Sequence, residues 1–439
     1  MLATFAEGTP EFEAALARLE FRGEADFARV EPVVREILAA VRAEGDAAVQ
    51  RYNERFGRRA PRLLVPDYPG AAALARLPSE ARQALELAAA RIRDFHERER
   101  EPGFQYEAEG ILLGVRVQPV GRAGVYAPGG KARYPSSVLM SVVPARVAGV
   151  TETFVATPLA GDASDDPIYA AAYLSGATAI VDAGGAQAIA ALAYGTESVP
   201  RVDKVVGPGN VYVACAKRLV FGAVDIDGIA GPSEILVVAD DEADPRIVAA
   251  DLLSQAEHDE AAYPMLVCAS DLMARAVVRE LHEQLATLPK AIIARAALGN
   301  GAAFVTHSRD HMAAVANRIA AEHLALHVVD PHALFARIRH AGAVFLGTST
   351  PEATGDYLAG PSHVLPTGGA VRFGSPLGVY DFVTRTSMIQ YDHDALQRHE
   401  KAICALARLE DLEGHARAVE ARIPRASRSD APLPMERRR

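Results

Sequence analysis

The sequence predicts an α/β protein with two Rossmann-like parallel-sheet domains and small N- and C-terminal extensions. Its 439 residues exceed what a single hydrophobic core usually supports. Strand, glycine turn and helix patterns repeat over residues 120–235, and short apolar strands alternate with helical patterns again over residues 235–347. Such alternation predicts parallel sheets covered by helices on both faces. Two blocks of it predict two Rossmann-like halves with the working cleft between them.

The composition is that of an ordinary globular protein, with 50% hydrophobic and 23% charged residues. The net charge of −10 argues against a nucleic-acid-binding protein, which needs a basic face. The start of the chain has no signal-peptide pattern, and no apolar run approaches the roughly 20 residues of a membrane helix. We therefore expect a cytoplasmic protein. The cysteines are too few and scattered for a disulfide framework or a cysteine zinc site, and we expect them to be buried: Cys215, Cys268 and Cys404.

Two helices and a strand are expected ahead of the first block. Apolar residues at helical spacing over 30–41 predict an amphipathic helix that runs on toward Phe56. A second helix follows Ser79, and His96 on it is expected at the surface. Alternating residues over 114–120 predict a strand that leads into the block.

Within the first block, two glycine turns place polar residues at the start of helices. The pattern predicts a helix over 136–150 and a strand over 177–183. Gln187 falls in the first turn of the helix after that strand, and Asn210 directly precedes another helix. Unpaired backbone N–H groups at such helix ends attract phosphate or another anion. These turns are therefore candidate anion-binding positions.

The stretch 251–259, DLLSQAEHD, is the most informative part of the second block. It closes a predicted helix that Asp244 can cap and Pro245 can start. Gln255 and His258 are three residues apart, which on a helix places an amide oxygen and an imidazole on one face. Both could then reach one metal ion or one substrate. A polar surface turn is the alternative, because such spacings recur by accident.

Two further loops hold residues of catalytic type. Glu322 and His323 are adjacent where the predicted helix 309–321 meets a strand, and an exposed helix end is the alternative interpretation. Asp356 and His363 lie in a glycine-rich loop, a composition that suits close approach of the backbone to a ligand.

The sequence changes character from about residue 378. A strand-like stretch over 379–392 is followed by a predicted helix from Asp394 past Leu412. Gly414 lies between Glu410 and His415 and is expected to interrupt this helix. The segment is long enough to reach a neighbouring subunit.

From pattern alone, four of these residues form a mixed oxygen and nitrogen set with one carboxylate. Such a set suits zinc or a related divalent ion, although no pair has a strong spacing such as HExxH. The four are Gln255, His258, Asp356 and His415.

Six blocks, in order along the chain, resemble the histidinol dehydrogenase family. They are AGGAQAIAALAYGTESVPRVDKVVGPGN, DGIAGPSEILVVAD, DLLSQAEHDE, EHLALHV, AGAVFLG and GDYLAGPSHVLPTGG. The resemblance extends over residues 25–420 and implies an aldehyde-dehydrogenase-like arrangement of the two Rossmann-like domains. It also implies an NAD-dependent, zinc-requiring homodimer that oxidises L-histidinol to L-histidine through L-histidinaldehyde, the last step of histidine biosynthesis.

The resemblance implies a role for twelve residues, matched by position. The zinc ligands, for one ion per subunit, are Gln255, His258, Asp356 and His415. The general bases are Glu322 and His323. The NAD contacts are Tyr126, Gln187 and Asn210. Besides the zinc ligands and His323, the substrate contacts are Ser233, His363 and Glu410. Glu410 and His415 are implied to come from the partner subunit.

Three alternatives differ in the chemistry of this site. A paralogue with the same catalytic pair could act on another small hydroxy compound such as a hydroxysulfonate, but the presence of Glu410 and His363 favours histidinol. A zinc hydrolase could use Glu322 and a metal-bound water, but it gives no reason for the glycine turns. A non-catalytic metal-binding protein gives no reason for the base pair. The sequence departs from the family's frequent residues at Ala321, Ser362 and Gly414, which bears on loop rigidity.

The predicted domain boundaries follow from these blocks. We expect an N-terminal extension over 1–24 and a first Rossmann-like domain, with the metal and catalytic residues, over 25–125 and 235–377. The second Rossmann-like domain, with the NAD contacts, spans 126–234. A C-terminal dimerisation extension over 378–423 and a disordered basic tail over 424–439 complete the chain.

Overall fold

The computed structural model describes residues 1–22, 27–57, 60–129 and 133–423. The chain divides into two compact units. The first comprises Met1–Arg100 and Pro119–Val383, and the second comprises Glu101–Gln118 and Thr384–Arg439. The predicted tail over 424–439 lies outside the described residues.

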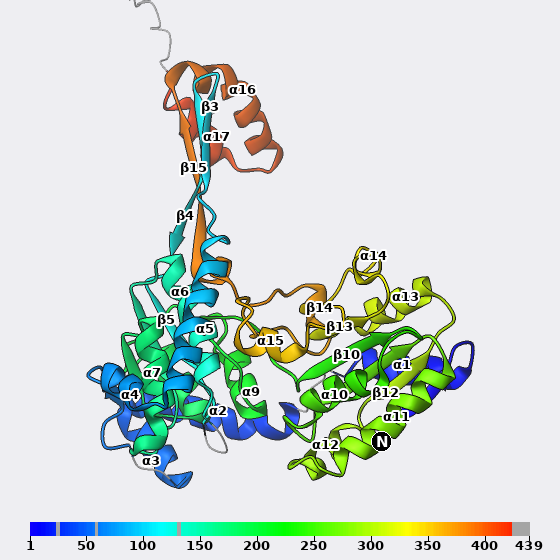
Figure 1. Ribbon diagram of the computed structural model, residues 1–439. Helices are drawn as coiled ribbons and strands as arrows, with labels where there is room; N and C mark the ends of the chain where they lie inside the picture. The colour runs from blue at the N-terminus through cyan, green and yellow to red at the C-terminus, as the bar shows by residue number, and fades with distance from the viewer. Residues whose placement is uncertain (23–26, 58–59, 130–132, 424–439) are drawn as a thin grey trace, which may run out of the picture. The chain divides into compact units, whose positions relative to one another are not determined.

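One six-stranded sheet of the first unit has the order β1-β12-β11-β10-β13-β14, and its described strands all pair in parallel (Figure 1). Its strands are β1 (Ala3–Ala6), β10 (Glu234–Ala239), β11 (Tyr263–Cys268), β12 (Ala302–Val305), β13 (His323–His327) and β14 (Ala343–Leu346). The central strand β10 is buried along its whole length, which explains its continuous apolar run.

Helices cover both faces of this first sheet. Alternate residues of β10 enter different cores: Ile235 and Val237 pack with α10, α11 and α12, whereas Leu236 and Val238 pack with α1, α13 and α14. The helices are α1 (Pro10–Glu20), α10 (Pro245–Ala256), α11 (Asp271–Leu285), α12 (Ala291–Ala297), α13 (Arg309–Ile319) and α14 (Pro331–Phe335). The predicted two-sided parallel sheet is confirmed.

The second sheet of the first unit has the order β2-β7-β6-β5-β8-β9. Its strands are β2 (Leu64–Val65), β5 (Arg122–Tyr126), β6 (Glu152–Ala156), β7 (Ala179–Val181), β8 (Lys204–Val206) and β9 (Asp225–Ile226). Only β2 runs antiparallel to its neighbour among the described strands of this sheet. This short edge strand precedes the parallel block in the chain.

Helices also cover both faces of the second sheet. One core contains residues of α2 (Phe27–Glu44), α3 (Asp46–Arg55), α8 (Gly185–Tyr194) and α9 (Val211–Val220). The opposite core contains residues of α5 (Ser79–Glu97), α6 (Pro135–Ala148) and α7 (Asp166–Ser175). The short helix α4 (Gly70–Arg76) packs on α7, which follows the 3-10 turn η1 (Ala163–Asp165).

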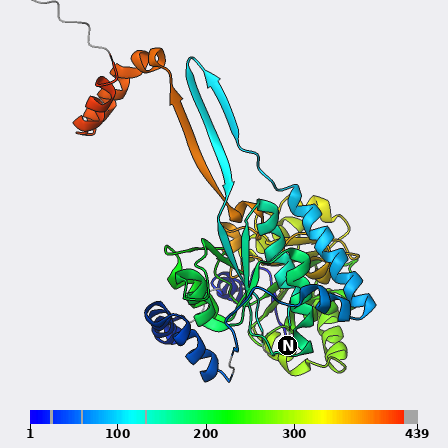
Figure 2. The same ribbon diagram turned by 90° about the vertical axis from the view of Figure 1, so that its left-hand side faces the viewer.

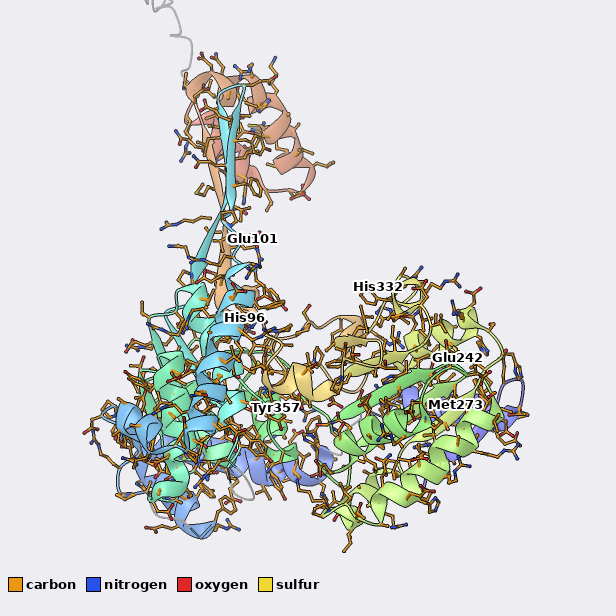
Figure 3. All side chains as sticks on the ribbon, viewed as in Figure 1. His96, Glu101, Glu242, Met273, His332 and Tyr357 are labelled. Atoms are coloured by element: carbon orange, nitrogen blue, oxygen red, sulfur yellow. The ribbon has the colours of Figure 1, made fainter. Side chains whose placement is uncertain are left out.

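The helices of residues 27–97 pack with the second sheet, whereas the predicted division grouped 25–125 with the first. Their apolar stripes fit either sheet, so periodicity alone could not choose between the two. His96 was expected at the surface, and this was wrong. It lies on α5 (Figure 3) and is 0% exposed. Its Nδ1 lies 2.7 Å from a carboxylate oxygen of Glu99.

The second unit contains a three-stranded sheet with the order β15-β4-β3 and two helices (Figure 2). Its strands are β3 (Phe104–Ala108), β4 (Ile111–Pro119) and β15 (Val383–Tyr391). The turn between β3 and β4 has positive φ at both Glu109 and Gly110, as a two-residue hairpin turn of type I′ requires.

The two helices of the second unit are α16 (His393–Leu409) and α17 (Glu413–Glu420). The predicted interruption at Gly414 was wrong in position. The helix is interrupted at residues 410–412, where Asp411 has a φ of 57° and the Leu412 N–H donates to the Ala407 carbonyl at 2.8 Å. Gly414 lies in the first turn of α17. Among the described helices of both units, none is long and apolar enough to cross a membrane.

Candidate active site

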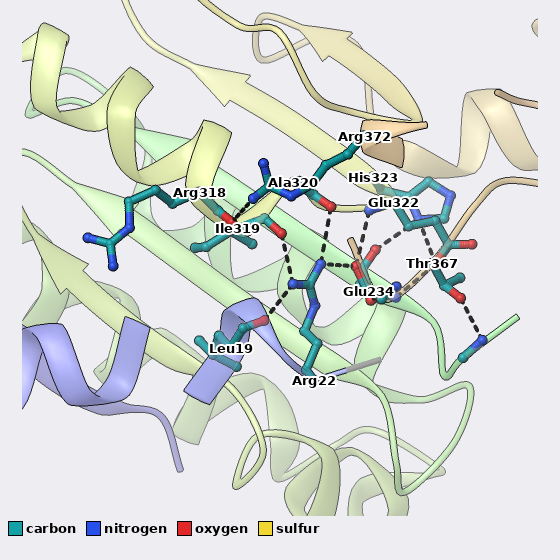
Figure 4. Close-up of polar contacts among 12 residues, drawn as sticks. Leu19, Arg22, Glu234, Arg318, Ile319, Ala320, Glu322, His323, Thr367 and Arg372 are labelled. Carbon is teal, nitrogen blue, oxygen red and sulfur yellow. Dashed lines mark hydrogen bonds and ion pairs between the residues drawn. The ribbon is translucent and has the colours of Figure 1, made fainter. Parts of the chain in front are cut away.

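Glu322 and His323 lie where α13 has ended and β13 begins (Figure 4). Both are buried, which excludes the alternative of an exposed helix end. The Glu234 N–H donates to Glu322 Oε2 at 2.9 Å, and His323 Nδ1 lies 2.9 Å from the Glu234 carbonyl oxygen. A carbonyl oxygen only accepts, so Nδ1 carries the hydrogen of a neutral His323. Its Nε2 is left with a free lone pair.

The surroundings favour the neutral form of both side chains. Burial, reinforced by the Glu234 carboxylate, raises the pKa of Glu322 well above its ordinary value. Burial lowers the pKa of His323 to about 4, against the opposing effect of Asp356. A neutral imidazole can accept a proton, and a carboxyl with a raised pKa is a better base once it is ionised.

The short helix α15 (Glu352–Tyr357) brings two carboxylates to His323. Ligand-type atoms of His323, Glu352 and Asp356 all lie within 4.8 Å of one another. Glu352 Oε1 lies 3.5 Å from His323 Nδ1, and burial followed by Asp356 raises the pKa of Glu352 well above its ordinary value. The sequence analysis missed Glu352. Its place four residues before Asp356, on one face of a helix, is the signal that could have found it.

Gln255, at the end of α10, and His258, in the turn that follows, approach the same cluster. Asp244 caps this helix and Pro245 starts it, as predicted. The buried Gln255 lies in its last turn, but the helix ends at Ala256, so the placement of His258 on the helix was wrong. Instead, a turn in which the His258 N–H donates to the Gln255 carbonyl at 3.2 Å follows the helix. His258 is still close enough to lower the pKa of His323 by like-charge repulsion.

His363 is oriented at both ring nitrogens. Its Nδ1 donates to the Asp356 carbonyl at 3.0 Å, and the Ser137 hydroxyl of α6 lies 3.3 Å from its Nε2. Burial lowers the pKa of His363, which Asp356 opposes. The adjacent loop contains the 3-10 turns η2 (Ala370–Arg372) and η3 (Val379–Phe382).

The residues predicted to contact the nucleotide lie after the carboxyl ends of strands in the second sheet. Tyr126 ends β5, Gln187 is in the first turn of α8 after β7, and Asn210 caps α9 after β8. The Gly185 N–H donates to the Tyr126 hydroxyl at 3.0 Å. In parallel sheets this edge is where nucleotides bind. The strand order β7-β6-β5-β8 places the three residues along one such edge.

Gln187 has an unused acceptor that fits a bound polar ligand at this edge, and Gly207 allows the close packing of the neighbouring turn. Gln187 is buried, and its Nε2 donates to Asn53 at 3.2 Å, but its Oε1 has no hydrogen-bond partner among the residues that the structure describes. Gly207 has a φ of 112°, and a Cβ there would lie 2.1 Å from the Tyr126 carbonyl oxygen. The turn before α9 therefore requires glycine.

The first unit thus gathers six of the predicted site residues around the start of β13: Gln255, His258, Glu322, His323, Asp356 and His363. Ser233 directly precedes β10. Glu410 follows the end of α16 and His415 lies in α17, both in the second unit.

The donor chemistry of the cluster fits a divalent cation. The side-chain amide of Gln255 lies within hydrogen-bonding reach of the Glu352 carboxylate. An amide oxygen, imidazoles and carboxylates are ligands that zinc and related ions accept.

Fold and site together define an α/β enzyme with two Rossmann-like sheets and a buried histidine and carboxylate cluster on one of them. The family model described as histidinol dehydrogenase matches residues 20–423. The chain belongs to the histidinol dehydrogenase family, as its resemblance predicted, and is an oxidoreductase of the last step of histidine biosynthesis.

Individual relatives agree with this assignment. The chain is 51% identical over 418 residues to histidinol dehydrogenase from Syntrophotalea carbinolica, covering 94% of this chain and 97% of the relative. It is 50% identical to the Pseudomonas aeruginosa enzyme, covering 89% and 90%. The crystal structure of histidinol dehydrogenase from Elizabethkingia anophelis superposes with a TM-score of 0.90 at 33% identity, covering 96% and 98%.

Proposed function

We propose that this protein catalyses the four-electron oxidation of L-histidinol to L-histidine through L-histidinaldehyde, as a zinc-containing, NAD-dependent homodimer of the cytoplasm. The observation that carries the proposal is the buried pair Glu322 and His323 beside the cluster of Glu352 and Asp356, in a chain of the histidinol dehydrogenase family. A carboxyl and an imidazole side by side supply two bases, one for each oxidation.

His323 is the base for the alcohol step. An alcohol loses its hydroxyl proton poorly at neutral pH, so removal of a hydride needs a positioned base. The Glu234 carbonyl holds Nδ1 of His323 and leaves Nε2 free to take that proton. Its pKa of about 4 keeps the ring neutral, and therefore able to accept a proton, throughout the physiological range.

Glu322 is the base for the aldehyde step. The aldehyde has to be hydrated before it can lose a second hydride, so a water must be deprotonated as it attacks. Burial and Glu234 raise the pKa of Glu322, which makes its carboxylate a stronger base than an exposed glutamate. Burial raises the pKa of all three cysteine thiols, which keeps them protonated and poor nucleophiles: Cys215, Cys268 and Cys404.

The proposed zinc ligands are Gln255, His258, Asp356 and His415, one ion per subunit, with Glu352 beside them. When bound, zinc holds and orients the substrate's nitrogen groups, the positioning role of a metal. Ser233, His363 and Glu410 are the remaining proposed substrate contacts.

Tyr126, Gln187 and Asn210 are the proposed NAD contacts. When bound, NAD accepts one hydride in each oxidation. The N-terminus of α8 has no side-chain cap from Gly184, and Gln187 has an Oε1 that no described residue hydrogen-bonds; both are proposed to contact the nucleotide. Glu410 and His415 are proposed to reach the site from the partner subunit.

The test is to incubate zinc-loaded protein with L-histidinol and NAD and to count NADH per histidinol consumed. Two NADH per histidinol, with L-histidine as product, are expected because the reaction removes four electrons. Turnover without NAD would favour a zinc hydrolase. Absence of turnover with zinc present, followed by oxidation of a hydroxysulfonate or another hydroxy compound, would overturn the substrate assignment.

A further inference from the structure

A buried ion pair lies beside the two proposed bases (Figure 4). Arg22 follows α1 near the start of the chain, and its guanidinium contacts the carboxylate of Glu234 on β10. Both side chains are 1% exposed. A buried charged pair contributes little to stability compared with well-packed apolar residues, so its presence here calls for a reason beyond stability.

The Arg22 guanidinium also holds the turn that leads into the bases. Its Nη1 donates to the Ile319 carbonyl at 2.8 Å and to the Leu19 carbonyl at 2.6 Å, and its Nη2 donates to the Ala320 carbonyl at 3.2 Å. Ala320 has a φ of 51°, a left-handed conformation that costs alanine energy. Arg22 thus braces a strained turn two residues before Glu322.

Glu234 connects this brace to both bases. Its carboxylate accepts from the Glu322 N–H at 3.2 Å and from the Gly368 N–H at 2.5 Å. Its own N–H donates to the Glu322 carboxylate, and its carbonyl accepts from His323 Nδ1. One residue therefore fixes the Glu322 backbone, the Glu322 carboxylate and the tautomer of His323.

We propose that Arg22 and Glu234 are positioning residues that hold Glu322 and His323 in register for proton transfer. The inference rests on the roles proposed above for the two bases. The planar guanidinium reaches three carbonyls and a carboxylate in one geometry, which an ammonium on a flexible stem cannot reproduce. Displacement of a base by about 1 Å is enough to cost about 10²-fold in rate.

The experiment is steady-state kinetics of Arg22→Ala with and without added guanidinium chloride at millimolar concentration. We expect kcat to fall by about 10²-fold with L-histidinol and with L-histidinaldehyde, while KM changes little. Guanidinium should restore part of kcat in a saturable manner, because it can occupy the position of the missing Arg22 side-chain group. Ethylammonium has the charge but lacks the planar set of N–H donors, so it should restore little.

Arg22→Lys is a second variant for the case that Arg22→Ala does not fold. It keeps the charge beside Glu234 but lacks the planar guanidinium, so its kcat should lie between those of wild type and Arg22→Ala. If Arg22→Ala yields no folded protein, the lysine variant decides: a lowered kcat supports the proposal and a wild-type kcat overturns it.

Arg318→Ala is the matched control. Arg318 lies in the last turn of α13 and pairs with Glu13 and Glu20 of α1, but contacts neither base. It should retain the wild-type kcat. A wild-type kcat in Arg22→Ala, or a loss that guanidinium does not restore, overturns the proposal. Absence of NADH formation by the wild type in the same assay would instead count against the proposed function.

Discussion

At the scale of single residues, the backbone of one residue of β10, Glu234, determines how the two proposed bases differ. The Glu234 carbonyl holds Nδ1 of His323, whereas the Glu234 N–H holds the carboxylate of Glu322. The imidazole is kept neutral with one free nitrogen. The carboxyl is kept close, buried and hard to ionise. Adjacent residues with opposite titration behaviour suit two successive steps that need a base at different moments.

Substitution of each base should therefore affect a different half-reaction. His323→Asn should slow oxidation of L-histidinol by roughly 10²–10⁴-fold, because the alcohol proton loses its acceptor. Glu322→Gln should leave the first hydride transfer nearly intact and block oxidation of L-histidinaldehyde. Single-turnover NADH formation from each substrate measures both effects. Equal loss of both half-reactions in both variants would contradict the assignment of one base to each half-reaction.

The lowered pKa of His323 predicts its behaviour on titration. Because the folded value of about 4 lies below the ordinary 6.5, the folded protein binds fewer protons than the unfolded chain between these two pH values. Its contribution to stability is present above pH 6.5 and is lost as the pH falls toward 4. In the metal-free protein, nuclear magnetic resonance should find His323 neutral from about pH 5 upward. A midpoint near the ordinary value would contradict the burial argument.

The residues of the site that could be predicted from sequence are those with a local signal or a family match. Gln187 and Asn210 lie at helix starts that are preceded by glycine turns in the sequence, and both positions were predicted correctly. Arg22 and Glu234 were not found, because 212 positions separate them and only the tertiary fold joins them. Glu352 was also missed, because the sequence contains many carboxylates and only the folded position of α15 brings this one to His323.

At the scale of elements, the turn between β8 and α9 combines stability with a proposed binding role. Asn210 caps α9 by accepting from the Tyr212 N–H at 3.1 Å and the Val213 N–H at 3.2 Å. An N-cap of this kind contributes about 1 kcal/mol. The same side chain is the proposed NAD contact, so the two roles have to be separated by substitution.

Asn210→Ser and Asn210→Ala separate them. Serine can still cap α9 but is shorter, so we expect the Ser variant to keep its stability while KM for NAD rises. Alanine cannot cap, so the Ala variant should show the same rise and lose about 1 kcal/mol of unfolding free energy. Urea unfolding and NAD titration measure the two effects. A Ser variant with unchanged KM for NAD would show that Asn210 is a cap and nothing more.

Most elements follow from rules that act within a few residues, which is why the alternating strands and helices of both blocks were predicted. The errors occur where the chain departs from these rules. His258 lies past the end of α10, and α16 ends at Leu409 rather than at Gly414. At Asp411 a non-glycine residue adopts positive φ, for which sequence gives only a weak signal.

At the scale of the whole molecule, the assignment of helices to sheets is what sequence could least determine. The helices α2 and α5 bury apolar stripes against the second sheet, although the predicted boundaries place them with the first. The change of pattern after residue 378 anticipated only the C-terminal part of the second unit, because the predicted boundaries grouped its other part, Glu101–Gln118, with the first Rossmann-like domain. In the single chain, large apolar side chains of this unit are exposed to solvent, among them Ile389 at 71% and Leu409 at 81% exposure. In the proposed homodimer, we expect the second subunit to bury them.

The proposed sharing of a site between subunits predicts recovery of activity when two inactive variants are mixed. His258→Ala removes a proposed ligand in the first unit, and His415→Ala removes one in the second. Each homodimer should be inactive. In a heterodimer one site loses both ligands and the other retains both, so the purified heterodimer should have about half of the wild-type activity. Co-expression of the two chains with different tags, followed by purification of the heterodimer and assay with L-histidinol, measures this. Heterodimers without activity, from chains that each bind NAD normally, would place both ligands of a site in the same subunit.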